Sequence, residues 1–143
     1  MGLEAQLERA LDLLIQGDAV GAQKMISQIE AAVVAESAAQ QAAVHLAIGR
    51  VFLQTEHMQK AITRAQHALV LNPTYREAHF DLGLFYVAAG DLKMATQVYE
   101  RAIVQYGKDP RAAGLLQQFV QGGLAVEGAR EMLAVHFGEG ATP

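Results

Sequence analysis

The sequence has 143 residues, 52% of them hydrophobic and 18% charged, which is enough for one folded domain with a packed core. Because it has no cysteine, disulfides, thiolate metal sites and cysteine nucleophiles are excluded. Its formal net charge is −4, and its lysines and arginines are scattered, whereas nucleic-acid binding requires a basic patch.

The N-terminal sequence MGLEAQLERALDLL places acids and an arginine among its leucines. It therefore lacks the basic flank and uninterrupted apolar run of a signal peptide. No stretch is apolar for long enough to span a bilayer. We expect a cytoplasmic protein, unless the sequence is a domain of a longer, exported one.

Alanine, leucine, glutamine and glutamate dominate, and no segment alternates as strands do, so we predict an all-α chain. Signals for helix ends and starts are Gly17-Asp18, Ser37 with Gln40, Thr74 with Glu77, Gly90-Asp91, and Asp109 with Pro110. They predict eight helices at 3–16, 19–35, 38–55, 58–71, 75–89, 92–106, 110–121 and 125–137.

These helices pair into four hairpins, and a small residue recurs early in each second helix. The four residues are Ala22, Ala61, Ala95 and Ala129. The last two intervals, 61 to 95 and 95 to 129, are 34 residues each. The first interval, 22 to 61, is 39 residues because five extra residues lie around AESAA. The chain therefore contains an internal repeat.

This period, and the residues at several positions of the two middle copies, resemble the tetratricopeptide repeat. The copy from Ala42 has Ile48-Gly49, Phe52, Ala61, Ala68 and Pro73 at the family's positions. The copy from Arg76 has Leu82-Gly83, Tyr86, Ala95, Tyr99 and Ala102, with Gly107 in place of the closing proline. The outer copies match less well, as expected for repeats that face water on one side.

The resemblance implies a right-handed α-solenoid of four helical hairpins that forms a single domain over 1–143. Within it we expect a degenerate repeat at 3–36, repeats at 42–75 and 76–109, a degenerate capping repeat at 110–137 and a flexible tail at 138–143.

In this family the first helices of successive repeats line the concave side, so residues on those helices that do not pack within the hairpins should face a groove. The expected partner-binding residues are Leu7, Leu11, Leu14, Leu46, Arg50, Leu53, Phe80, Leu84 and Val87, with Asp81 beside them. Most are apolar, and an apolar patch with a polar rim usually marks a binding surface.

Chaperone adaptors of the family grip a C-terminal carboxylate with Lys, Asn and Arg, but Leu46, Arg50 and Asp81 stand at the corresponding places here. We therefore expect the groove to bind an apolar or amphipathic segment of a protein partner. Three alternatives stay open. The chain's own GLAVEGAREMLAVHF segment or a second copy of the protein could fill the groove, or the protein could be a small bacterial secretion or assembly chaperone.

We expect no enzymatic activity, no cofactor and no metal. His45 and His79 share one repeat position and are expected to pack, whereas His57 and His67 are expected to be solvated. His136 is expected to be a surface or capping residue. No serine has a histidine near it in sequence that would suggest a catalytic triad.

Overall fold

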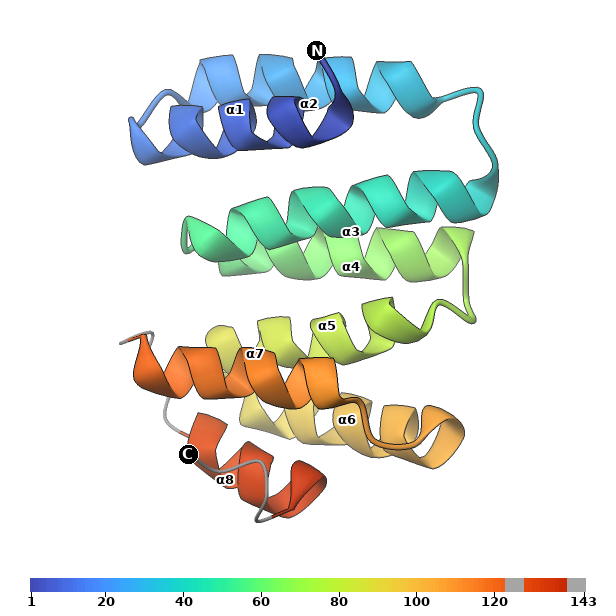
Figure 1. Ribbon diagram of the computed structural model, residues 1–143, viewed down its shortest axis with the longest axis vertical. Coiled ribbons are helices and arrows are strands. Elements are labelled where there is room, and N and C mark those ends of the chain that lie inside the picture. The colour runs from blue at the N-terminus through green and yellow to red at the C-terminus, as the bar shows by residue number, and fades with distance from the viewer. Residues whose placement is uncertain (123–127, 139–143) are drawn as a thin grey trace. The chain divides into compact units, whose positions relative to one another are not determined.

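The computed structural model of the chain describes residues 1–122 and 128–138. Every regular element in these residues is helical (Figure 1), which confirms the predicted fold class. The elements are α1 (Leu3–Ile15), α2 (Ala19–Val33), α3 (Ala38–Gln54), α4 (Met58–Leu71), α5 (Arg76–Ala88), α6 (Leu92–Tyr106), α7 (Pro110–Gln121), α8 (Ala129–Met132) and the π-helical η1 (Leu133–Phe137). None of the described helices combines the length and apolarity needed to cross a bilayer.

The helix boundaries follow the predicted capping signals. The Ser37 hydroxyl accepts a hydrogen bond from the backbone of Gln40, and the Gln40 side chain accepts one from the backbone of Ser37, which completes a capping box. The Asp109 carboxylate accepts from the backbone N–H of Arg111 at 2.9 Å, with Pro110 in the first turn of α7. Local sequence therefore sets where these helices start.

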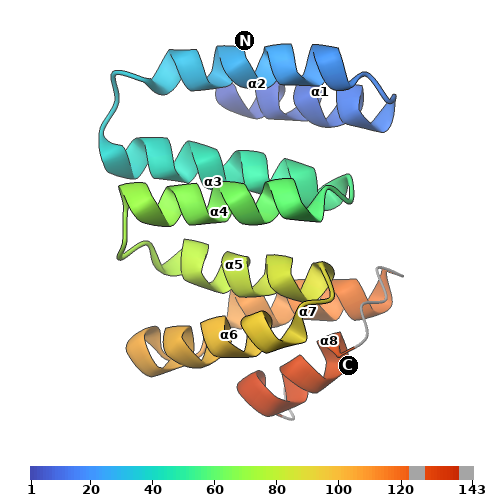
Figure 2. The same cartoon turned by 180° about the vertical axis from the view of Figure 1, so that it is seen from behind.

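The chain divides into two compact units, residues 1–75 and 76–143. In the first unit, α1 pairs with α2 and α3 pairs with α4, and α3 also contacts α1 and α2 (Figure 2). Two of the recurring small residues, Ala22 and Ala61, are at most 1% exposed where the helices of each pair meet. A methyl group at these positions allows the two helix axes to approach closely.

In the second unit, α5 pairs with α6, and α7 packs on α5. Tyr99 of α6 is fully buried, and its ring lies against Phe80 with 6.4 Å between ring centroids. The C-terminal elements α8 and η1 contact α7, and η1 also contacts α6. This unit therefore has its own core around Tyr99.

The last helix differs from the prediction of one α-helix over 125–137. Residues 125–127 lie outside the described part of the chain, and from Leu133 the helix has π geometry. The wider turn places His136 and Phe137 against the Tyr99 ring, at centroid distances of 5.9 and 5.6 Å. His136 is buried rather than at the surface, so our expectation for this histidine was wrong.

Glu56 is the one non-glycine residue with positive φ in the described chain, at 63°. It stands in the turn between α3 and α4, where the equivalent turns have Gly17 and Gly90 with φ of 82° and 80°. A side chain at positive φ costs about 1–2 kcal/mol. We expect Glu56→Gly to raise the free energy of unfolding by about 1 kcal/mol, measured by urea unfolding. A lower free energy of unfolding for Glu56→Gly than for the wild type would contradict the inference that the backbone at Glu56 is strained.

Gly83 lies under the Tyr99 ring, and a Cβ at this position would stand 3.1 Å from ring atoms. Gly114 in α7 has open space where a Cβ would be added. We expect Gly83→Ala to destabilise the protein by about 1–3 kcal/mol through overpacking. Gly114→Ala should stabilise it by about 0.5–1 kcal/mol through helix propensity. Thermal unfolding of both variants measures the two changes in stability. Equal changes in melting temperature would contradict the close approach of the Tyr99 ring to Gly83.

Candidate functional site

The ten predicted groove residues differ widely in exposure. Leu7, Leu11, Leu14 and Arg50 are partly exposed, whereas Leu46, Leu53, Phe80, Asp81, Leu84 and Val87 are buried. The partly exposed residues all belong to α1 and α3 of the first unit. The structure therefore leaves accessible surface on the α1 and α3 part of the predicted stripe.

The α5 residues are covered, contrary to their expected position on an open groove. Phe80, Leu84 and Val87 are at most 1% exposed, and Asp81 is 3% exposed. This helix packs on both α6 and α7, which explains why it is apolar on nearly every side. A ligand could reach these residues only if the surrounding side chains moved, so their role in partner binding stays a prediction.

A cavity of about 230 Å³ lies between α1 and α3. Its lining residues are Leu7, Glu8, Leu11, Ala47, Arg50, Val51 and Gln54. Three residues predicted from the repeat pattern, Leu7, Leu11 and Arg50, are thus brought together around one hollow. Leucine side chains give it an apolar wall, and Glu8 and Arg50 contribute one charge of each sign.

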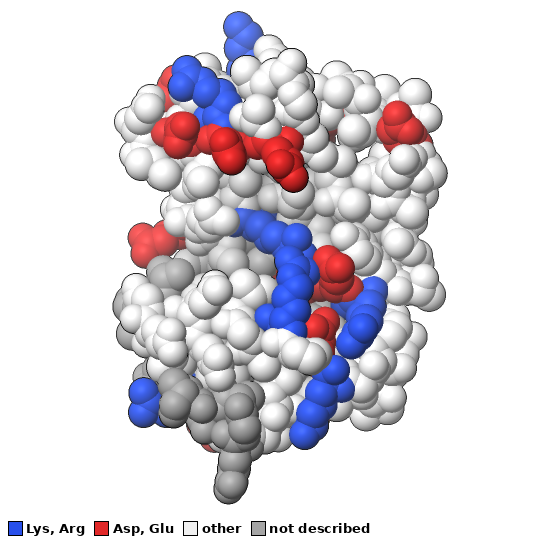
Figure 3. Space-filling model, viewed as in Figure 1, with Lys and Arg blue, Asp and Glu red and all other residues white. Residues whose placement is uncertain are grey.

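The acids of α1 form a row beside this cavity. Glu4, Glu8 and Asp12 follow each other at intervals of four residues, so they share one helix face, and all three are exposed. Figure 3 shows a row of acidic side chains over this helix. The α1 side of the cavity therefore carries negative charge, whereas α3 contributes the Arg50 guanidinium.

A polar cluster in the first unit links α2, α3 and α4. Arg64 of α4 pairs with Glu30 of α2 at 3.2 Å, and its second terminal nitrogen lies 3.0 Å from Nδ1 of His45. The His45 and His67 rings stack with 4.0 Å between centroids. Burial lowers the pKa of His45 below 6.5, and the neighbouring His67 and Arg64 lower it further, against an opposing effect of Glu30.

Two ion pairs join neighbouring hairpins. Glu30 and Arg64 are 34 positions apart, and so are Glu77 and Arg111, whose side chains meet at 2.9 Å. Each pair joins corresponding helices of neighbouring hairpins within one unit. Corresponding helices of successive hairpins are therefore neighbours in space, as repeat stacking requires.

The histidines do not assemble a metal site in the described part of the chain, where no group of three or more histidine, aspartate or glutamate side chains could hold an ion. His79 lies against Tyr106 with 5.5 Å between ring centroids. His57 has its Nδ1 2.9 Å from the Thr55 hydroxyl. The expectations that the protein has no metal and no catalytic activity remain predictions.

Comparison with known proteins agrees with the repeat pattern. Residues 52–119, just under half of the chain, match the family model described as tetratricopeptide repeat. A structure titled "Crystal structure of MamA" is similar at 23% identity and a TM-score of 0.56, covering 98% of this chain and 76% of that one. A second, titled "Crystal structure of MamA protein", has 23% identity, a TM-score of 0.54 and coverages of 95% and 69%.

At this level of identity the likeness to MamA concerns the fold. No curated protein matches the sequence. The partner and the binding residues therefore have to be argued from the site itself.

The lowered pKa of His45 predicts how stability changes with pH. The unfolded chain takes up a proton near pH 6.5, whereas the folded chain resists doing so, so the contribution of His45 is complete above about pH 6.5 and declines as the pH falls below it. We expect the free energy of unfolding to decrease less between about pH 7.5 and 5 in His45→Gln than in the wild type.

Urea unfolding at a series of pH values measures this difference in slope, independently of the stability lost with the buried ring. Some pH dependence should persist in the variant, because burial also lowers the pKa of His136 in the second unit. Parallel curves for the wild type and His45→Gln would exclude His45 as a source of the pH dependence.

Proposed function

We propose that this chain, which contains tetratricopeptide repeats over residues 52–119, is a non-enzymatic interaction module that binds an apolar or amphipathic segment of a protein partner. The observation that carries the proposal is the cavity between α1 and α3. These are the first helices of neighbouring hairpins, and the resemblance to the family implies that such helices line the concave, ligand-binding side.

The chemistry of the cavity indicates what kind of segment fits. Leu7, Leu11 and the other apolar side chains offer surface whose burial would contribute about 25 cal/mol per Å² before the costs of association. Glu8 and Arg50 lie at opposite walls, on α1 and α3. Charges of opposite sign placed in this way would fix the direction in which a ligand lies.

An amphipathic helix suits this arrangement best, because its apolar positions recur on one face and its polar edges would meet Glu8 and Arg50. The row of acids on α1 favours a ligand with lysine or arginine along the edge that faces this helix. Leu14, Leu46 and Leu53 would then extend or support the contact rather than form its centre.

The chain's own C-terminal segment is a weaker candidate for the ligand. Its described residues, 128–138, contact α6 and α7 within the second unit. Ala129, Met132, Leu133 and Phe137 are buried there, so their apolar surface is already used. A second copy of the protein remains the alternative ligand that an experiment has to separate from a different partner.

We expect Leu11→Glu to abolish partner binding while costing roughly 1–2 kcal/mol of stability, since Leu11 is only partly buried. Val20→Glu is the matched control, because Val20 is 82% exposed and is not among the residues that line the cavity. Phe80→Glu should cost about 4 kcal/mol or more, because it places a charge in the core of the second unit.

The measurement is affinity capture from an extract of the source cells with the wild type, Leu11→Glu and Val20→Glu, combined with light scattering of each purified protein. Proteins retained by the wild type and Val20→Glu but lost with Leu11→Glu would support the proposal. Equal retention by all three would overturn it. A wild-type oligomer that dissociates on Leu11→Glu would identify a second copy as the ligand.

A further inference from the structure

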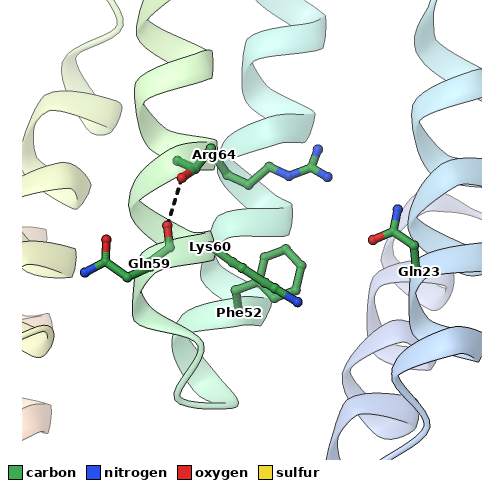
Figure 4. A pocket seen from close by; sticks show the side chains of 6 residues that line it. Gln23, Phe52, Gln59, Lys60 and Arg64 are labelled. Carbon is green, nitrogen blue, oxygen red and sulfur yellow. Dashed lines mark hydrogen bonds between the residues drawn. The ribbon is translucent and has the colours of Figure 1, made fainter.

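A second cavity, of about 300 Å³, opens between α2 and the α3–α4 hairpin. It is lined by Gln23, Phe52, Gln59, Lys60, Thr63 and Arg64, and it shares no residue with the cavity between α1 and α3. Figure 4 shows Gln23 on one side, facing Phe52, Lys60 and Arg64 across the gap. The volume has room for one or two side chains of a ligand.

The lining of the cavity is cationic, although Glu30 outside it pairs with Arg64 and the whole chain is negative. Two of its six lining residues are cations, and none is an acid. The Lys60 ammonium stands 5.6 Å from the centroid of the Phe52 ring, and no carboxylate of the described residues forms an ion pair with it. Lys60 is exposed, so its ammonium is open to a ligand.

Arg64 is held in a fixed orientation. One terminal nitrogen pairs with Glu30 at 3.2 Å and the other lies 3.0 Å from His45, so two neighbouring helices restrain the guanidinium. Arg64 is only partly buried. The cavity thus combines one mobile cation on a flexible stem with one positioned cation, four residues apart on the same face of α4.

The remaining lining residues add polar groups and an apolar floor. The Thr63 hydroxyl donates to the backbone carbonyl of Gln59 at 2.9 Å, and the exposed Gln59 side chain adds an amide to the lining. Phe52 is 4% exposed, and its ring supports the Lys60 stem. A ligand therefore meets polar groups and cations, and the Phe52 ring lies beneath the Lys60 stem.

We propose that this cavity binds an acidic side chain, aspartate or glutamate, from an exposed peptide segment of a protein partner. A carboxylate would pair with the Lys60 ammonium, and neighbouring aliphatic groups of the segment would lie on the Lys60 stem. A polyanion such as nucleic acid fits poorly, because only two cations are present and the chain carries a net charge of −4.

This second site does not depend on the groove proposed above, since the two cavities have separate linings. Lys60→Gln and Leu11→Glu therefore test different surfaces. One protein could use the two surfaces for two partners or for two segments of one partner. In the second case, linkage of the two binding events would raise the overall affinity.

The probe is the peptide acetyl-Leu-Asp-Leu-Glu-Leu-amide, titrated into ¹⁵N-labelled protein and followed by amide chemical shifts. Its control is acetyl-Leu-Asn-Leu-Gln-Leu-amide, which has the same shape without carboxylates. We expect saturable shifts at residues lining the cavity with the acidic peptide only, weakened by added salt. Lys60→Gln should weaken binding about tenfold, and Lys93→Gln, an equal loss of charge on exposed α6 surface, should leave it unchanged.

Three outcomes would overturn the proposal. The amide peptide could shift the same residues as strongly, which would remove the carboxylate from the interaction. Inorganic phosphate alone could produce the same shifts with the same affinity, which would indicate a general anion site. Lys60→Gln could bind the acidic peptide as tightly as the wild type while its spectrum remains that of a folded protein.

Discussion

Each hairpin depends on a residue no larger than alanine near the start of its second helix. The four alanines at these positions are at most 1% exposed, and at Gly83 in α5 even a methyl group would meet the Tyr99 ring. Close helix contact at these points sets the distance between the two helices of a pair. Within the first unit, the two hairpins built in this way border the hollows between α1 and α3 and between α2 and the α3–α4 hairpin.

Much of the fold could be predicted because its signals are local or periodic. Capping residues such as Ser37 and Asp109 act within one helical turn, so they can be identified without knowledge of the fold. The 34-residue period and the small residues identify the hairpins, and seven helices begin and end within two residues of the predicted bounds. The π-helical end was not predictable from local sequence, because the Tyr99 ring that it contacts lies far away in sequence.

The candidate sites were harder to predict because they depend on how many neighbours cover each helix. The repeat pattern grouped Leu11 and Phe80 in one stripe, yet Leu11 borders a cavity and Phe80 is buried in a core. Residue type cannot distinguish these cases, since a buried face and a ligand-binding face are both apolar. The cavity beside Lys60 was missed because three helices contribute to it. The opposite charges of Glu30 and Arg64, on the second helices of successive hairpins, were the signal that could have located it.

The ion pairs between successive repeats restrict how such a chain can grow or shrink during evolution. Glu77 and Arg111 meet because their spacing of 34 residues equals one structural unit, and Glu30 meets Arg64 because α2 and α4 are the second helices of neighbouring hairpins. An insertion inside a helix would shift one charge of a pair out of register with the other, whereas an insertion in a connecting turn would leave both charges in place. Length variation among related genes should therefore occur in connecting turns, such as the one around AESAA, which already holds extra residues between Glu30 and Arg64.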